Sequence, residues 1–185
     1  RADFKATAGR FYEDALWLLG PQGLAAFESM PATAPASTAV LMPASGYFVA
    51  RSDWSSRADY LCFDAGEQAA GMRTDSVPNS MHGHADCLAM TAWLDGRQVL
   101  IDSGLFAYNY GGVWEDHFRE TAAHNTAKID GKDQALHIRK MAWSHSYRAT
   151  VEQWTPNDDR AWVLGSHDGY ERGPDGVRHR RAVWL

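Results

Sequence analysis

The chain has 185 residues, of which 45% are apolar and 22% charged, a composition typical of one globular domain with a core of its own. No apolar run reaches the roughly 18 residues that a membrane span requires, so no span is expected. The formal net charge of -5 argues against nucleic acid as the main partner. Two cysteines are too few for a disulfide framework, and Cys62 and Cys87 are expected to be free thiols.

The first 45 residues predict helices followed by a linker. Phe11, Ala15 and Leu19 recur at every fourth position within residues 9–19, which predicts a helix that ends at Gly20 and Pro21. A second short helix is expected over residues 24–30. Residues 31–45 are rich in Pro, Ala, Ser and Thr and predict a linker.

From Gly46 onward the pattern is that of many short strands. They are expected over residues 47–51, 59–63, 88–94, 98–101, 126–129, 147–154, 161–166 and 177–185. Asp95-Gly96 and Asp130-Gly131 are typical hairpin turns, and residues 65–81 predict a loop. The sequence therefore predicts a mainly β protein, an antiparallel β-sandwich with a short helical N-terminal remnant.

Three histidines and an aspartate form the pattern most suggestive of chemistry. In an extended segment, His82 and His84 project to the same face, and neutral imidazole is a good ligand for zinc-like ions. Asp102 directly follows the apolar strand QVLI, and His124 comes later in the chain. Together they predict a site for a divalent metal. Asp86 is a further candidate, which we assign to holding a histidine in place rather than to the metal.

Other polar and aromatic residues near this pattern are candidates for substrate contact. Tyr108 and Tyr110 follow a turn, and a tyrosine can transfer a proton at a glycosidic oxygen. Arg119 can hold a carboxylate through two parallel hydrogen bonds, or it can form a surface ion pair. Asn125, next to His124, is expected to contact substrate or support the site.

The stretch HGHADCLAMTAWLDGRQVLIDSGLFAYNYG, followed by HFRETAAHNTAKIDGKDQ, resembles the heparinase II/III-like polysaccharide lyase family. The upstream GYFVARSDW looks like that family's first sandwich strand, and the resemblance extends loosely to HRRAVWL at the end. It implies that residues 1–30 end an α-toroid domain, that 31–45 link the domains, and that 46–185 form the sandwich, which is expected to be truncated at the C-terminus.

The resemblance also implies an activity and roles for these residues. The implied reaction is β-elimination on an acidic polysaccharide or oligosaccharide that contains uronic acid, such as a glycosaminoglycan or alginate. One divalent metal, with zinc favoured, is implied at His84, Asp102 and His124. His82 is implied to line the catalytic cleft, and Tyr110 to take part in proton transfer.

The resemblance leaves several points open. Tyr108 is the alternative to Tyr110, and in the family further catalytic residues come from the toroid, so this chain alone is expected to be inactive. A periplasmic or secreted location follows by analogy only. A non-catalytic glycan-binding module with a structural metal is the alternative function. A cupin-like metalloenzyme is disfavoured, because Leu88, Ala89 and Met90 stand where cupins have a glutamate.

Overall fold

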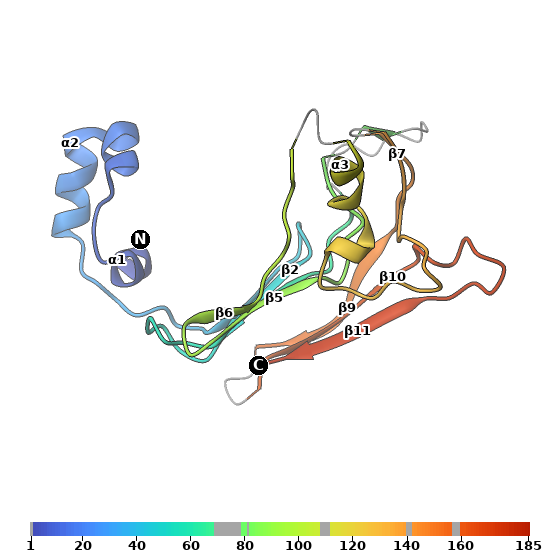
Figure 1. Ribbon diagram of the computed structural model, residues 1–185. Helices are drawn as coiled ribbons and strands as arrows, with labels where there is room; N and C mark the ends of the chain where they lie inside the picture. Colours follow the sequence, from blue (N-terminus) through green and yellow to red (C-terminus); the bar gives the residue numbers. More distant parts are fainter. Residues whose placement is uncertain (1, 69–78, 81, 108–111, 140–141, 157–159) are drawn as a thin grey trace.

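The computed structural model describes residues 2–68, 79–80, 82–107, 112–139, 142–156 and 160–185. The helices α1 (Ala2–Ala8) and α2 (Glu13–Ser29) stand to one side of a body built from antiparallel strands (Figure 1). No described helix is both long and apolar enough to cross a membrane. The predominance of antiparallel sheets, with few short helices, confirms the predicted fold class.

The break predicted at Gly20 is present as a kink inside α2. Gly20 adopts φ 67° and ψ -173°, a conformation that glycine tolerates and that interrupts the helix. Helix α1 precedes this region and was not predicted. Neither helix has a buried residue, and Trp17 and Leu18 are 89% and 84% exposed. The apolar side chains of these helices therefore do not belong to the core of the strand-rich body.

The larger sheet has the strand order β1-β2-β3-β5-β6, with antiparallel neighbours throughout. Its strands are β1 (Ala39–Met42), β2 (Tyr47–Arg51), β3 (Tyr60–Asp64), β5 (Met90–Leu94) and β6 (Arg97–Leu100). Strand β1 lies inside the segment 31–45 that we expected to be a linker. Residues 39–42 (AVLM), between Pro35 and Pro43, pair along their whole length with β2. The composition of the segment alone does not reveal this pairing.

Both predicted hairpin turns form, but only one joins two strands. Asp95 and Gly96 adopt φ values of 52° and 71° between β5 and β6. Asp130 and Gly131 adopt similar values, yet the strand expected over 126–129 is absent apart from one isolated bridge. The hydroxyl of Thr126 donates instead to a backbone carbonyl in the loop before β5, so a side-chain hydrogen bond rather than strand pairing holds this residue.

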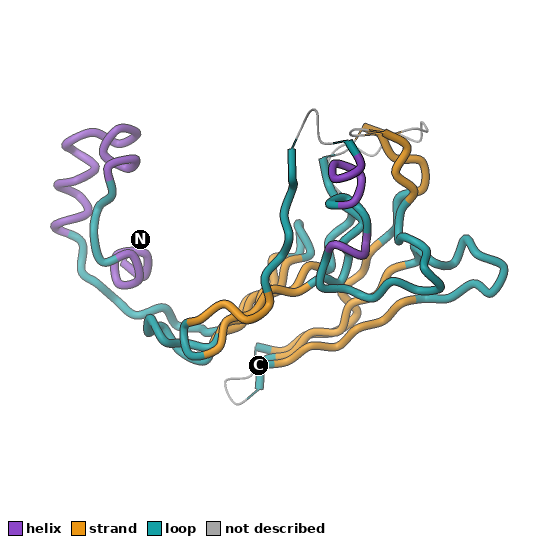
Figure 2. The backbone as a smooth tube through the Cα atoms, viewed as in Figure 1, coloured by secondary structure: helices purple, strands orange, loops and turns teal. Residues whose placement is uncertain are grey.

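Two further sheets complete the body. One has the order β11-β10-β9, with β9 (Ala149–Thr155), β10 (Trp162–His167) and β11 (His179–Trp184). A small sheet has the order β4-β8-β7, with β4 (Asn79–Ser80), β7 (Leu136–Arg139) and β8 (Ala142–His145), and was not predicted. Figure 2 shows the larger sheet and the β9–β11 sheet running alongside each other as two layers.

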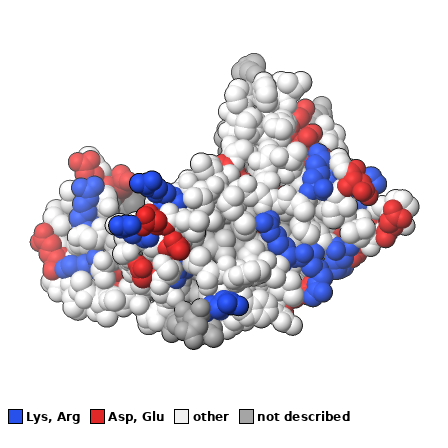
Figure 3. All heavy atoms as spheres, turned by 60° about the horizontal axis from the view of Figure 1, so that its bottom comes forward, with Lys and Arg blue, Asp and Glu red and all other residues white. Residues whose placement is uncertain are grey.

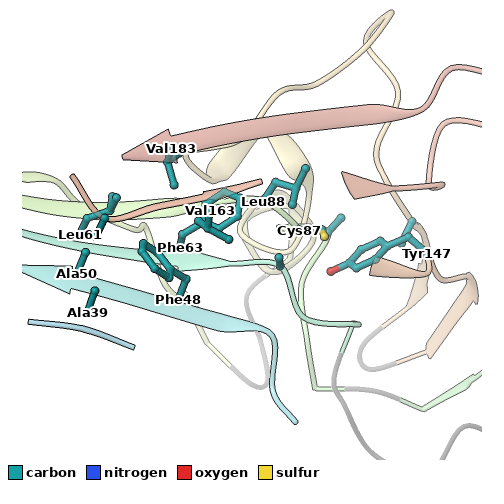
Figure 4. Close-up of a cluster of buried hydrophobic side chains, with 14 of the residues drawn as sticks. Ala39, Phe48, Ala50, Leu61, Phe63, Cys87, Leu88, Tyr147, Val163 and Val183 are labelled. Atoms are coloured by element: carbon teal, nitrogen blue, oxygen red, sulfur yellow. The ribbon is translucent and has the colours of Figure 1, made fainter. Parts of the chain in front are cut away.

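The hydrophobic core lies between these two layers (Figure 4). Phe48 and Phe63 point inward from β2 and β3, and Val163 points inward from β10; all three are fully buried. Burying side chains of this size contributes about 1.5–3 kcal/mol each. The predicted free thiols are confirmed, with Cys87 buried and Cys62 half-buried.

Charged side chains are spread over the surface in mixed groups. On the face shown in Figure 3, acidic and basic side chains occur together in two groups that a broad uncharged area separates. Within the described residues, Arg178 forms an ion pair with Glu171, and Arg180 forms one with Glu152. This face therefore carries mixed charge rather than one large field of a single sign.

Gly165 in β10 fixes how closely the two layers approach. A Cβ at this position would lie 2.7 Å from Cδ2 of Leu88 and 3.0 Å from Cβ of Ala65. Both neighbours are buried, so neither can move away cheaply.

We predict that Gly165→Ala lowers the free energy of unfolding by about 1–3 kcal/mol, because the added methyl group overpacks the core. Urea unfolding followed by circular dichroism measures this change. Gly173→Ala is the matched control, since its nearest neighbour would lie 3.6 Å away. Equal stability of the two variants would show that Gly165 does not set the spacing of the layers.

His167 at the end of β10 is fully buried and is held in one neutral form. Its Nδ1 accepts a hydrogen bond from the backbone N–H of Gly169 at 3.1 Å, so its Nε2 carries the proton and lies 3.0 Å from Nδ1 of His179. Burial lowers the pKa of His167 to about 3, and the charges of His179 and Arg172 act in the same direction.

The lowered pKa of His167 predicts a loss of stability in mild acid. The unfolded chain binds a proton below about pH 6.5 while the folded chain does not, so stability is complete above that pH and falls toward pH 3. At pH 5 the loss is about 2 kcal/mol relative to pH 7. Denaturant unfolding across this range tests it, and His167→Gln should flatten the slope; an unchanged slope would contradict the assignment.

Candidate functional site

Three segments that are distant in sequence meet at one end of the larger sheet: the loop 82–89, the end of β6, and residues 119–126. The backbone N–H of Ala85 donates to the carbonyl of Arg119 at 2.9 Å, which joins the first segment to the third. The side-chain amide of Asn125 donates to the carbonyls of Met90 and Ile101, each at 3.0 Å. Asn125 therefore joins the third segment to β5 and to the segment after β6.

Three side chains from elsewhere in the chain also donate hydrogen bonds to the loop before β5. The Thr126 hydroxyl and the Gln134 amide both donate to the carbonyl of Cys87, at 2.7 and 3.0 Å. Arg181 of β11 reaches across to the carbonyl of Leu88 at 3.0 Å. Leu88 itself has φ 59°, which is unusual for a non-glycine residue and is kept here by its complete burial.

This framework brings His84, Asp86 and His124 together. One possible ligand atom from each lies within 4.8 Å of the other two, and the two imidazole centroids are 5.1 Å apart. Among the described residues no other group of three His, Cys, Asp or Glu side chains is this close. Two imidazoles and one carboxylate are a usual ligand set for a zinc-like ion.

Asp102 lies next to this cluster and fixes the proton on His124. Its Oδ2 is 2.8 Å from Nδ1 of His124, so that nitrogen donates to the carboxylate. The Nε2 of His124 is buried and has no hydrogen-bond partner among the described residues. A buried nitrogen with a free lone pair, oriented by a carboxylate on the other side of the ring, suits a metal ligand.

The electrostatics of the cluster also suit a cation. Burial lowers the pKa of His84 to about 4, and the positive charges of His124 and Arg119 add to this effect. Burial raises the pKa of Asp86 to about 6. The hydrogen bond from His124 lowers the pKa of Asp102. Although burial lowers it, the hydrogen bond to Asp102 and the charge of Asp86 raise the pKa of His124 overall. A bound cation would compensate the buried carboxylate, use the lone pair of neutral His84 and require the neutral form of His124.

The structure brings the predicted metal residues and Asp86 close together. His84 and His124 lie in the cluster as expected. Asp86, which we assigned to holding a histidine, lies within the same group, and Asp102, which we assigned to the metal, is hydrogen-bonded to His124; both assignments stay predictions. The same-face spacing of His84 and Asp86 was the available signal, since residues two apart in extended backbone share a face.

The structure describes only some of the predicted catalytic and substrate-binding residues. His82, two residues before His84, is exposed, while Tyr108 and Tyr110 lie outside the described residues. Arg119 is only 1% exposed and lies behind the cluster rather than at the surface. Its Nε and Nη2 have no hydrogen-bond partner among the described residues, and Nη2 is 4.0 Å from Oε1 of Glu115.

Comparisons with known proteins agree with this fold. A family model described as Heparinase II/III-like, C-terminal, matches residues 34–185. No curated protein matches the chain. Among solved structures, the heparan sulfate lyase HepC from Pedobacter heparinus is 17% identical with a TM-score of 0.64, over 100% of this chain and 26% of that one. A heparinase III is 22% identical with a TM-score of 0.63, over 84% and 22%.

At these identities the solved structures establish the shared fold. The chain spans about a quarter of the length of the lyases that it resembles. The likeness therefore concerns the strand-rich part of those larger proteins and the helices that precede it.

Proposed function

The chain belongs to the heparinase II/III-like family, in its C-terminal region, and from this premise we propose that it is the metal-bearing β-sandwich part of a polysaccharide lyase. The substrate class is an acidic glycan that contains uronic acid. The observation that carries the proposal is the meeting of His84, Asp86, Asp102 and His124 at one end of the larger sheet. By analogy with the family, the complete protein acts in the periplasm or outside the cell.

The proposed reaction is β-elimination. A base removes the proton at C5 of the uronate, the electron pair forms the C4–C5 double bond, and the bond from C4 to the bridging oxygen breaks as that oxygen takes a proton. The C5 proton becomes acidic only when the negative charge of the neighbouring carboxylate is neutralised. The site must therefore supply positive charge, a base and an acid.

The residues of this chain are assigned to these tasks as follows. His82, an exposed imidazole two residues before His84, is the proposed proton-transfer group. Tyr110, or Tyr108, is the proposed acid on the sandwich side. The buried guanidinium of Arg119 lies near His84 and favours negative charge in the cleft, although its burial places it behind the substrate surface.

A divalent cation, with zinc favoured, would be held by His84, His124 and Asp86, with Asp102 orienting His124. Such an ion supplies fixed positive charge and locks the loop that carries His82. Three protein ligands leave one coordination position open.

A second candidate function is a glycan-binding module that keeps the metal for stability. It is favoured by the burial of His124 and by the hydrogen bonds from Thr126 and Gln134 to the Cys87 carbonyl, which hold the surrounding loop. In that case the metal would contribute to folding and not to turnover.

The ligand assignment predicts different effects for the two aspartates. We expect about one zinc per chain, abolished by Asp86→Asn, whereas Asp102→Asn lowers zinc affinity by about 10–100-fold because only the orientation of His124 is lost. Elemental mass spectrometry and zinc titration measure both. His145→Ala, an exposed histidine outside the cluster, is the control. Complete loss with Asp102→Asn and retention with Asp86→Asn would reverse the assignment.

The lyase proposal predicts an unsaturated product. The complete protein, incubated with heparan sulfate or alginate, should release 4,5-unsaturated uronate, which is followed by its ultraviolet absorbance. His82→Ala should lower the rate by about 10²–10⁴-fold, as expected for loss of a proton-transfer group. The 185-residue chain alone is expected to give no product. Glycan binding without product from the complete protein would favour the binding-module alternative.

A further inference from the structure

A row of four side chains crosses the outer face of the larger sheet, away from the core. Arg51 of β2 pairs with Tyr60 of β3, Tyr60 pairs with Trp93 of β5, and Trp93 pairs with Gln98 of β6. Because cross-strand partners lie on the same face, these residues are successive neighbours. The residues that alternate with them, such as Ala50 and Leu61, point into the core.

The aromatic members of this row are in contact with the arginine and with each other. The guanidinium of Arg51 lies 4.4 Å from the ring centroid of Trp54 and 5.8 Å from that of Tyr60. The rings of Tyr60 and Trp93 meet edge to face with centroids 5.0 Å apart. Trp54 remains 40% exposed. The guanidinium of Arg51 therefore lies near two aromatic rings, and one of them, that of Trp54, is partly open to solvent.

Trp54 is held in position although it lies in the loop between β2 and β3. Arg57 makes two hydrogen bonds to the carboxylate of Asp95, at 2.6 and 2.9 Å. The backbone N–H of Asp95 donates in turn to Oδ1 of Asp59 at 2.8 Å. These contacts attach the loop to the hairpin turn between β5 and β6, so its conformation is set by the sheet.

A hollow opens between this loop and the helical part of the chain. It has a volume of about 410 Å³ and is lined by Trp54, Pro35 and, from α1, Asp3, Phe4 and Thr7. Figure 1 shows α1 as the helix nearest to this end of the larger sheet. Phe4 is 60% exposed, so aromatic side chains from two parts of the chain line one hollow. Its volume lies in the range of small-ligand sites, about 300–1,000 Å³.

Arg51 has no carboxylate partner among the described residues. Its Nε is buried without a hydrogen-bond partner there. The nearby carboxylate of Asp53 accepts a hydrogen bond from the backbone N–H of Ser55 at 2.6 Å instead. The charge of Arg51 acts on Asp53 without an ion pair between the two side chains. A guanidinium that is fixed by aromatic rings and makes no ion pair within the described residues is suited to a carboxylate or sulfate from outside.

We propose that Arg51, Trp54, Tyr60 and Trp93 form a binding site for one acidic sugar of a glycan chain, separate from the metal cluster. Aromatic faces suit the C–H face of a sugar ring, and Arg51 suits its carboxylate or sulfate, while Gln98 and Thr7 offer partners for hydroxyl groups. Trp93 lies three residues along β5 from Met90, whose carbonyl binds the site residue Asn125, a separation of about 10 Å. A glycan that reaches both positions would span more than one sugar. The proposal rests on the acidic-glycan substrate proposed above.

Isothermal titration calorimetry of the chain with a heparan sulfate hexasaccharide and an alginate hexasaccharide tests the site. For whichever hexasaccharide binds the unaltered chain, we expect Trp54→Ala and Arg51→Gln each to raise the dissociation constant about tenfold. Trp184→Ala, which removes a 63% exposed tryptophan from β11, is the matched control and should leave binding unchanged. Arg51→Lys keeps the charge but not the flat group, so it should also weaken binding, and thermal unfolding verifies that each variant is folded.

The outcomes separate this site from the lyase proposal. Equal affinity of the folded variants and the unaltered chain overturns the site, and it leaves intact a lyase that releases unsaturated product. Failure of the unaltered chain to bind either hexasaccharide also overturns it. Binding that depends on Arg51 and Trp54, without unsaturated product from the complete protein, supports the site and counts against the lyase.

Discussion

The loop from His82 to Ala89 contains no regular secondary structure, and the site depends on how the rest of the chain holds it. Its backbone carbonyls accept hydrogen bonds from Thr126, Gln134 and Arg181, which come from different parts of the chain. Each such bond has a modest net value of about 0.5–1.5 kcal/mol, but leaving a buried carbonyl without a partner costs more. The loop can therefore keep one conformation only while the two layers of the sandwich are packed together.

The same packing determines the charge state of the site. Burial disfavours the charged forms of both His84 and Asp86, which leaves a neutral imidazole facing a carboxylate whose charge is costly. Asp102, hydrogen-bonded to His124, is the carboxylate whose ionised form is favoured. The protein thus stabilises one negative charge directly and leaves the second for a cation to compensate.

The two proposed glycan contacts lie at different places on one sheet. The metal cluster lies where β5 begins, and the row from Arg51 to Trp93 lies where β5 ends. A polymer substrate gains affinity from contacts at several sugars, and contacts remote from the reacting bond help to position it. The outer face of a sandwich sheet is a suitable support, because side chains that alternate with the core residues are held at fixed spacing.

Local signals in the sequence determined much of this protein. The alternation in YFVAR and the turn at Asp95-Gly96 predicted strands β2, β5 and β6, and the glycine at position 20 predicted the break in α2, because these features act through neighbouring residues. The pairing of His84 with His124 also followed from the sequence. The sequence did not predict β1 or the small β4-β8-β7 sheet, since short strands form only when a distant partner is present.

Only the tertiary structure decided which aspartate lies beside the histidines and where Arg119 and Asn125 point. Asp86 and Asp102 are equally plausible ligands along the chain. In the fold, Asp86 offers an oxygen within 4.8 Å of ligand atoms of His84 and His124, and Asp102 is hydrogen-bonded to His124. Such choices depend on contacts between residues that are far apart in sequence. Their geometry is fixed by the packing of the layers, a property of the whole fold that no local pattern encodes.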